Sequence, residues 1–253
     1  IDEFSSHIKD IYFPTPTLNE TKIIIANKTL DILYYTDIGM EPLTYFLAFS
    51  KLAFNQCVTF GHPITSGIST IDYFISSELC EPKNAQEHYS EKLVKLPYLS
   101  IDYRPTLTEV KKTRFNFKLE TDKNIYFCPQ SLFKFHPDFD KIMAEILRKD
   151  KKGNIILISG QHSKWKDKLV KRFNTQIPDV TSRIHFLPRL SQEEYFAALS
   201  RSDVILDTIY FGGGNTSYEA FAMGKIVITL PGKFLRGRVT LGLYKKMSII
   251  EPI

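Results

Sequence analysis

Hydrophobic and polar positions along the chain predict strands and helices in alternation. Short apolar runs bounded by polar or turn residues are typical of buried parallel strands. In the first half, such runs are Leu30–Tyr35, Gln56–Phe60 and Ile71–Ile75. Apolar residues recur at helical spacing within Pro42–Phe54, which predicts a helix there. Asn84 can cap a second helix that runs to about Leu96, with charged residues such as Glu87, Glu91 and Lys95 on its solvated side.

The second half repeats the alternation more regularly. Strands are expected at Asn124–Cys128, Asn154–Ser159, Arg183–Phe186, Val204–Leu206 and Lys225–Thr229. Helices are expected at Asp138–Arg148, Trp165–Phe173, from Ser191 onward, at Asn215–Met223 and at Arg238–Lys246. Ser191 with Glu194 three residues later is a capping box. This order requires parallel strands joined by right-handed crossovers, so the predicted fold class is α/β with doubly wound sheets.

The two halves differ in how many strands they supply. Residues 1–115 hold about three strand candidates and end in a polar linker that begins at Pro97, whereas residues 116–253 hold about five. We therefore expect a partial N-terminal Rossmann-like domain on 1–115 that lacks its first strands. We expect a second such domain on 116–253 that lacks its closing helix.

Composition narrows the class of protein. Hydrophobic residues make up 43% of the 253 positions, which excludes a disordered chain. The three cysteines form no disulfide or metal-binding pattern, which favours a reducing compartment and a cytoplasmic location. No apolar run is long enough to span a bilayer, and no signal peptide is visible. A net charge of +5 permits an anionic ligand but does not indicate nucleic acid.

The segment Asp207–Glu219 contains the residues that are most informative about function. Three successive glycines, Gly212–Gly214, allow the backbone to approach a ligand, and Asn215 and Thr216 then begin a helix whose free amides suit a diphosphate. Glu219 lies about one turn further on, where it can reach a ribose diol. The alternative is an ordinary flexible loop before a helix.

Three other loops follow predicted strands. The loop Cys128–Lys134 can place the ammonium of Lys134 near the diphosphate site proposed at Asp207–Glu219. The alternative is that Lys134 is simply a solvated surface lysine. In Pro188–Tyr195, backbone groups can hydrogen-bond a nucleobase and the Tyr195 ring can pack on it. The alternative is that this segment only forms the start of a capped helix. Phe60–Gly67 contains His62, which can contact substrate or transfer a proton, although a loop histidine is often structural. His136 and His162 have no partner at metal-ligand spacing, so no metal is expected.

Several sequence blocks together resemble one known family. The blocks are GHPITSG, IDYFISSELCEP, AQEHYSEKLVKLP, CPQSLFK, LSQEEYFAALSRSDVILDT, FGGGNTSYEAFAMGKIVITLPG and RGRVT. They resemble the catalytic region of the O-linked N-acetylglucosamine transferases, especially the bacterial type, over residues 30–247. The resemblance implies a GT-B architecture of two Rossmann-like domains facing a cleft. It also implies a metal-free inverting transfer from a UDP-sugar, usually UDP-N-acetylglucosamine, to a Ser or Thr hydroxyl of a polypeptide. The tetratricopeptide repeats that precede this region in the family are expected in the parent protein.

The resemblance also assigns roles to individual residues. Lys134 would contact the diphosphate and act in catalysis, with Asn215 and Thr216 binding phosphate and Glu219 binding ribose. The remaining nucleotide contacts would come from Gln130, Gly214, the Leu190 backbone and Tyr195, the last two at the uracil. Gly61, His62 and Pro63 would line the sugar and acceptor side, and His62 is the candidate catalytic base.

Three alternatives remain open on the sequence alone. The same fold can serve a UDP-glucose-dependent protein glucosyltransferase. The chain can also be a non-catalytic UDP-binding module. A nucleic-acid binder is the third class, but it is supported only by the charge of +5 and the basic segment Lys164–Lys171.

Overall fold

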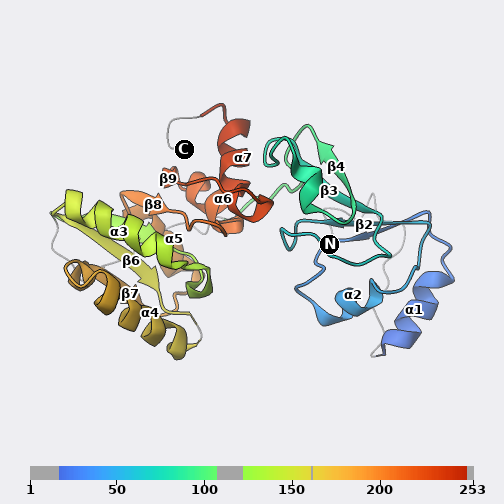
Figure 1. The fold of residues 1–253 in the computed structure, drawn as a ribbon, viewed down its shortest axis with the longest axis horizontal. Helices are drawn as coiled ribbons and strands as arrows, with labels where there is room; N and C mark the ends of the chain where they lie inside the picture. The colour runs from blue at the N-terminus through green and yellow to red at the C-terminus, as the bar shows by residue number, and fades with distance from the viewer. Residues whose placement is uncertain (1–16, 107–121, 161, 250–253) are drawn as a thin grey trace. The chain divides into compact units, whose positions relative to one another are not determined.

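The computed structural model describes residues 17–106, 122–160 and 162–249. The chain divides into two compact units (Figure 1). Unit 1 comprises Ile1–Ser76 and Asn84–Val94, and unit 2 comprises Ser77–Lys83 and Lys95–Ile253. The predicted domain boundary between residues 115 and 116 lies outside the described residues.

Unit 2 is built on a five-stranded sheet in the order β7-β6-β5-β8-β9. All four strand pairings are parallel. The strands are β5 (Asn124–Cys128), β6 (Gly153–Ile158), β7 (Ile184–Leu187), β8 (Val204–Leu206) and β9 (Val227–Ile228). The helices are α3 (Pro137–Lys149), α4 (Ser163–Gln176), α5 (Gln192–Arg201), α6 (Asn215–Ala222) and α7 (Val239–Lys246).

Alternate residues of each strand enter two different cores, one on each face of this sheet. Cys128, Ile155 and Leu157 pack with apolar residues of α3 and α4. Phe127 and Ile156, their neighbours along the strands, pack instead with residues of α5, α6 and α7. This period of two, with helices covering both faces, defines a doubly wound sheet (Figure 1). The predicted α/β fold class is confirmed.

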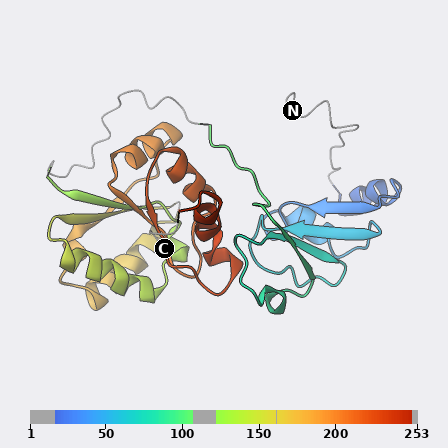
Figure 2. The same ribbon diagram turned by 90° about the horizontal axis from the view of Figure 1, so that it is seen from above.

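Unit 1 contains a smaller sheet of four strands in the order β1-β2-β3-β4 (Figure 2). The strands are β1 (Ile32–Tyr35), β2 (Asn55–Thr59), β3 (Tyr73–Ser77) and β4 (Lys92–Leu96), and the helices are α1 (Leu18–Ala26) and α2 (Pro42–Leu47). The β1–β2 and β2–β3 pairs are parallel. The first half therefore supplies one strand more than the sequence predicted.

The prediction of a helix from Asn84 to Leu96 is wrong. A short 3₁₀ turn at Ala85–His88 is followed by β4. The side chain of Gln86 stabilises this break, because it accepts from the Leu93 amide and donates to the Glu91 carbonyl, both at 2.9 Å. Pairing with the sheet thus overrides the helical spacing of the charged residues.

Two other differences concern helix ends and a helix that was not predicted. The helix predicted over Pro42–Phe54 ends at Leu47, because the chain must turn back to begin β2. Helix α1 was missed, although Thr17 and Glu20 form the Thr-x-x-Glu pattern of a capped helix start. In unit 2, β5 and β8 agree with prediction at both ends, and the capping box at Ser191 is present.

Part of the predicted linker after Pro97 is packed structure. Residues 97–106 are described and hydrogen-bond to α6, whereas residues 107–121 lie outside the description. Within the described ranges, no helix is both long enough and apolar enough to cross a bilayer.

Candidate nucleotide-binding site

The candidate site lies where the strand order of unit 2 reverses direction. Strands β5 and β8 are neighbours, yet the chain leaves β5 toward α3 on one face and leaves β8 toward α6 on the other. The two connections therefore separate at the carboxyl ends of these strands, which is where open α/β sheets bind ligands. Both loops singled out in the sequence, Cys128–Lys134 and Asp207–Glu219, follow these two strands.

Lys134 and Thr216 are brought to one place through Gln130. The Lys134 ammonium donates to Gln130 Oε1 at 2.9 Å and to the Gly212 carbonyl at 3.0 Å. Gln130 Nε2 donates in turn to Thr216 Oγ1 at 2.8 Å. The ammonium also lies 4.5 Å from the centre of the Phe211 ring. A continuous polar path therefore connects the lysine after β5 to the first turn of α6.

Asp207 is a buried carboxylate beneath this site, and it was not singled out from the sequence. It accepts from the Gly213 amide at 2.6 Å, Thr240 Oγ1 at 2.7 Å and Thr229 Oγ1 at 3.0 Å. Burial raises the pKa of Asp207, while the Thr240 and Gly213 hydrogen bonds act in the opposite direction. Burial lowers the pKa of Lys134, and the charge of Asp207 opposes that shift. The site thus holds a partly desolvated cation above a buried acid.

Two of the three glycines are required by close packing. A Cβ on Gly212 would lie 2.7 Å from Asp207 Oδ2, and one on Gly213 would lie 2.8 Å from Gln130 Nε2. A Cβ on Gly214 would meet nothing within 4 Å. Gly214 is the N-cap of α6 and provides no side-chain cap, so the first amides of α6 stay available to a ligand.

The residues expected at ribose and base lie further along α6 and at the start of α5. Glu219 Oε1 accepts from the Tyr103 hydroxyl at 3.0 Å, a contact that the sequence did not predict. The Tyr195 ring packs 6.3 Å from Phe127, centre to centre, in the core shared with Leu190. Burial and the nearby Glu219 charge raise the pKa of Tyr195. Tyr195 is therefore partly a core residue.

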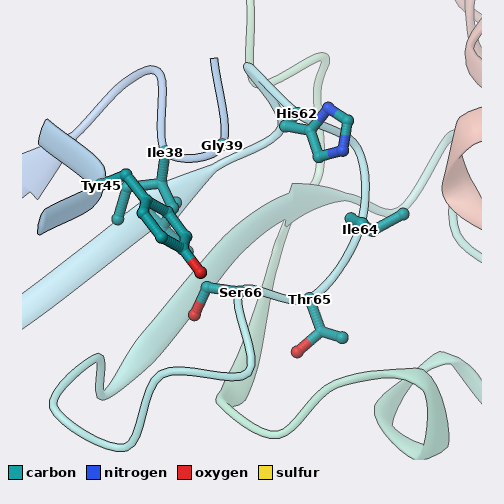
Figure 3. Close-up of a pocket in the computed structure, with 8 residues that line it drawn as sticks. Ile38, Gly39, Tyr45, His62, Ile64, Thr65 and Ser66 are labelled. Carbon is teal, nitrogen blue, oxygen red and sulfur yellow. The ribbon is translucent and has the colours of Figure 1, made fainter. Parts of the chain in front are cut away.

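His62, Gly61 and Pro63 lie in unit 1, in the loop after β2. His62 lines a cavity of about 240 Å³ together with Tyr45, Thr65 and Ser66 (Figure 3). In Figure 3 the Tyr45 hydroxyl points toward Ser66. No residue of the described chain hydrogen-bonds the His62 imidazole, so no partner fixes its tautomer there. Gly61 is needed for packing, because a Cβ would collide with the Thr36 carbonyl.

Glu91 fixes the shape of this loop, whereas the predicted helix would place it on a solvated face. Its side chain is buried and accepts from Thr65 Oγ1 at 2.6 Å and the Ser66 amide at 2.7 Å, and it also binds the Ser66 hydroxyl. Burial alone would raise the pKa of Glu91, but the Ser66 and Thr65 hydrogen bonds hold it below its ordinary value. The strand that replaces the predicted helix is what directs Glu91 inward.

Comparison with known proteins places the chain among glycosyltransferases. No family model matches it. It is 30% identical over 192 residues to a probable UDP-N-acetylglucosamine–peptide N-acetylglucosaminyltransferase, SEC of Arabidopsis thaliana, covering 71% of the chain and 19% of that protein. It is 23% identical over 221 residues to the UDP-glucose:protein N-beta-glucosyltransferase of Actinobacillus pleuropneumoniae serotype 5b (strain L20), covering 87% and 35%.

A solved structure shares the fold. A mutant of the Thermobaculum terrenum O-GlcNAc transferase superposes with a TM-score of 0.78 at 24% identity, over 92% of this chain and 44% of that one. The chain spans only about a third or less of the curated relatives named above. These similarities in sequence and fold relate the chain to the O-linked N-acetylglucosamine transferases and to bacterial protein glucosyltransferases.

Proposed function

We propose that the chain binds a UDP-sugar and serves an inverting transfer of N-acetylglucosamine from UDP-N-acetylglucosamine to Ser or Thr hydroxyls of a polypeptide. The observation that carries the proposal is the convergence of Lys134, Gln130 and Thr216 at the uncapped start of α6. A cation beside free helix amides matches a diphosphate in charge and in hydrogen bonding.

The chemistry follows from where charge develops. As the bond from the sugar C1 to the diphosphate oxygen breaks, the electron pair stays with UDP, and negative charge grows on the phosphate. Lys134 and the amides of Asn215 and Thr216 would stabilise this charge without a metal ion, because they are already in place. The acceptor hydroxyl forms the new bond to C1 and gives its proton to a base. In this proposal His62 takes that proton.

The donor contacts follow the same logic. Glu219 would accept from the ribose hydroxyls, and the Leu190 backbone with Tyr195 would contact the uracil. Gly61 and Pro63 would line the sugar and acceptor side with His62. The three buried free cysteines are compatible with the predicted cytoplasmic location, which remains part of the proposal.

Replacement of Lys134 tests the donor site. We expect Lys134→Ala to lower kcat/KM for UDP-N-acetylglucosamine by about 100-fold or more, since removing one preformed donor to developing charge typically costs that much. Titration calorimetry should show weaker UDP binding in the same variant. Lys168→Ala removes an exposed lysine of α4 and should change neither quantity. Turnover and UDP affinity like those of the unsubstituted chain in Lys134→Ala would refute the assignment.

A second candidate function keeps the donor site and changes the sugar. The similarity to a UDP-glucose:protein N-beta-glucosyltransferase extends over 87% of the chain, which favours testing UDP-glucose. Calorimetry with UDP-glucose and UDP-N-acetylglucosamine separates the donors. Mass spectrometry of modified peptides separates asparagine from hydroxyl acceptors. UDP binding without any transfer would support the non-catalytic alternative.

A further inference from the structure

The segment of residues 97–106, here called the strap, is tied to the helix that carries Glu219. The Tyr218 hydroxyl donates to the Ile101 carbonyl at 2.8 Å, and the Tyr103 hydroxyl donates to Glu219 Oε1 at 3.0 Å. The rings of Tyr103 and Tyr218 meet edge to face, with centres 5.8 Å apart. The strap, α6 and Glu219 all belong to unit 2. A segment more than 100 positions away in sequence therefore reaches the proposed ribose-binding carboxylate.

The contact affects how Glu219 can act. A glutamate on a helix surface has three side-chain torsions and would ordinarily sample several rotamers. Tyr103 removes that freedom, because a phenol donates only one hydrogen bond and here donates it to one defined oxygen. A carboxylate has about four lone-pair positions, so the bond from Tyr103 leaves acceptor capacity for a diol.

We propose that Tyr103 is a positioning residue for the nucleoside, holding Glu219 in the rotamer that accepts the ribose hydroxyls. The inference rests on the proposed function, because it takes Glu219 as the ribose ligand. It adds a specific role for the strap, which the sequence suggested was only a linker. Ribose recognition in this chain then depends on a residue outside the sheet and helices of the nucleotide-binding fold.

The opposite role would be a latch, in which Tyr103 occupies the site and must leave before a nucleotide binds. The two roles predict opposite signs for the same substitution. Loss of a positioning group weakens binding of a ribonucleotide, whereas loss of a latch strengthens it, because no contact has to be broken first.

The test is Tyr103→Phe, which removes the hydroxyl and keeps the ring that contacts Tyr218. We expect UDP affinity, measured by titration calorimetry, to fall about tenfold, as for loss of one hydrogen bond to a charged group. The second ligand is 2′,3′-dideoxy-UDP, which keeps the base and diphosphate but lacks the diol. Its affinity should be equal in Tyr103→Phe and in the unsubstituted chain.

Tyr98→Phe is the matched control, because Tyr98 lies in the same strap and its side chain is exposed. It should bind both ligands as the unsubstituted chain does, and equal thermal melting of the two variants would show that folding is intact. Unchanged or tighter UDP binding in Tyr103→Phe, or an equal loss for both ligands, would overturn the positioning role and leave the proposed function standing. An unsubstituted chain that binds neither ligand would overturn the proposed function and this inference with it.

Discussion

At the scale of single residues, the Lys134 ammonium is held in one position by hydrogen bonds within the candidate site. Its ammonium is half-buried between the Gly212 carbonyl and Gln130, and burial lowers the pKa of Lys134. A bound diphosphate would favour the charged form and reverse part of that shift. The two carbonyl oxygens hold the cation in place before the ligand arrives, so little reorganisation is needed on binding.

The same scale provides a test of the glycine loop. Gly213→Ala should lower UDP affinity by at least about tenfold and reduce thermal stability, because overpacking typically costs 1–3 kcal/mol. The new Cβ would lie 2.7 Å from Thr216 Oγ1 and 2.8 Å from Gln130 Nε2. It would therefore push these two side chains apart and break the hydrogen-bonded path from Lys134 to α6. Calorimetry and a thermal melt measure the two effects.

Gly232→Ala is the control for that substitution, since a Cβ at Gly232 meets nothing within 4 Å. It should leave UDP binding intact. If Gly213→Ala bound UDP like Gly232→Ala, close packing at Gly213 would not be what shapes the site.

At the scale of elements, the loop Phe60–Gly67 is shaped by β4 through Glu91. The carboxylate receives hydrogen bonds from Thr65, Ser66 and Ser90, which cross-link the loop to the start of the strand. His62 lies in the same loop, so its position depends on an acid almost 30 residues later in the chain. The predicted solvated helix would have directed this acid outward.

This arrangement predicts an acid-labile loop. The folded-state pKa of Glu91 is depressed, so its stabilising contribution is present above the unfolded-state value and is lost as pH falls through the folded-state value. Glu91→Gln should therefore flatten the loss of unfolding free energy below about pH 4.5. At neutral pH it should destabilise by about 2 kcal/mol, the typical cost of leaving buried donors poorly satisfied.

Urea unfolding as a function of pH measures the stability change, and hydrogen exchange of peptides that cover Phe60–Gly67 measures the loop. Glu87→Gln, an exposed acid in the adjacent 3₁₀ turn, is the matched control and should keep the unsubstituted profile. A parallel pH profile for Glu91→Gln and the unsubstituted chain would contradict this account of the loop.

At the scale of the whole molecule, the two units have separate sheets, and the proposed UDP-binding residues, Gln130, Lys134, Leu190, Tyr195, Gly214, Asn215, Thr216 and Glu219, all lie in unit 2. UDP at 100 times its Kd should stabilise that unit by about 2.7 kcal/mol. Hydrogen exchange with and without UDP should therefore show new protection in peptides from β5, β8 and α6. Phosphate in place of UDP is the control for the ribose and base contacts. New protection confined to unit 1 would be inconsistent with a donor site at β5 and β8.

The alternation of short apolar runs with amphipathic segments was sufficient to predict the doubly wound fold of unit 2, because each strand and helix there is locally consistent with its final environment. Strands such as β5 and β8 are buried on both faces, and their sequences show it directly. The position of the candidate donor site followed as well, since loops after parallel strands lie at the same sheet edge. The donor-site roles of Lys134, Thr216 and Glu219 remain predictions, although the structure brings Lys134 and Thr216 together.

Tertiary structure alone decided the contacts between segments distant in sequence. Glu91 holds the loop because β4 pairs with the sheet instead of forming a helix. Asp207 is a hydrogen-bonded buried carboxylate only because Thr229 and Thr240 fold against it. Tyr103 reached Glu219 because the strap packs on α6. The spacing of hydrophobic and polar residues indicates which face of a helix or strand is buried. The partner of a polar side chain, however, depends on which other elements the fold places beside it.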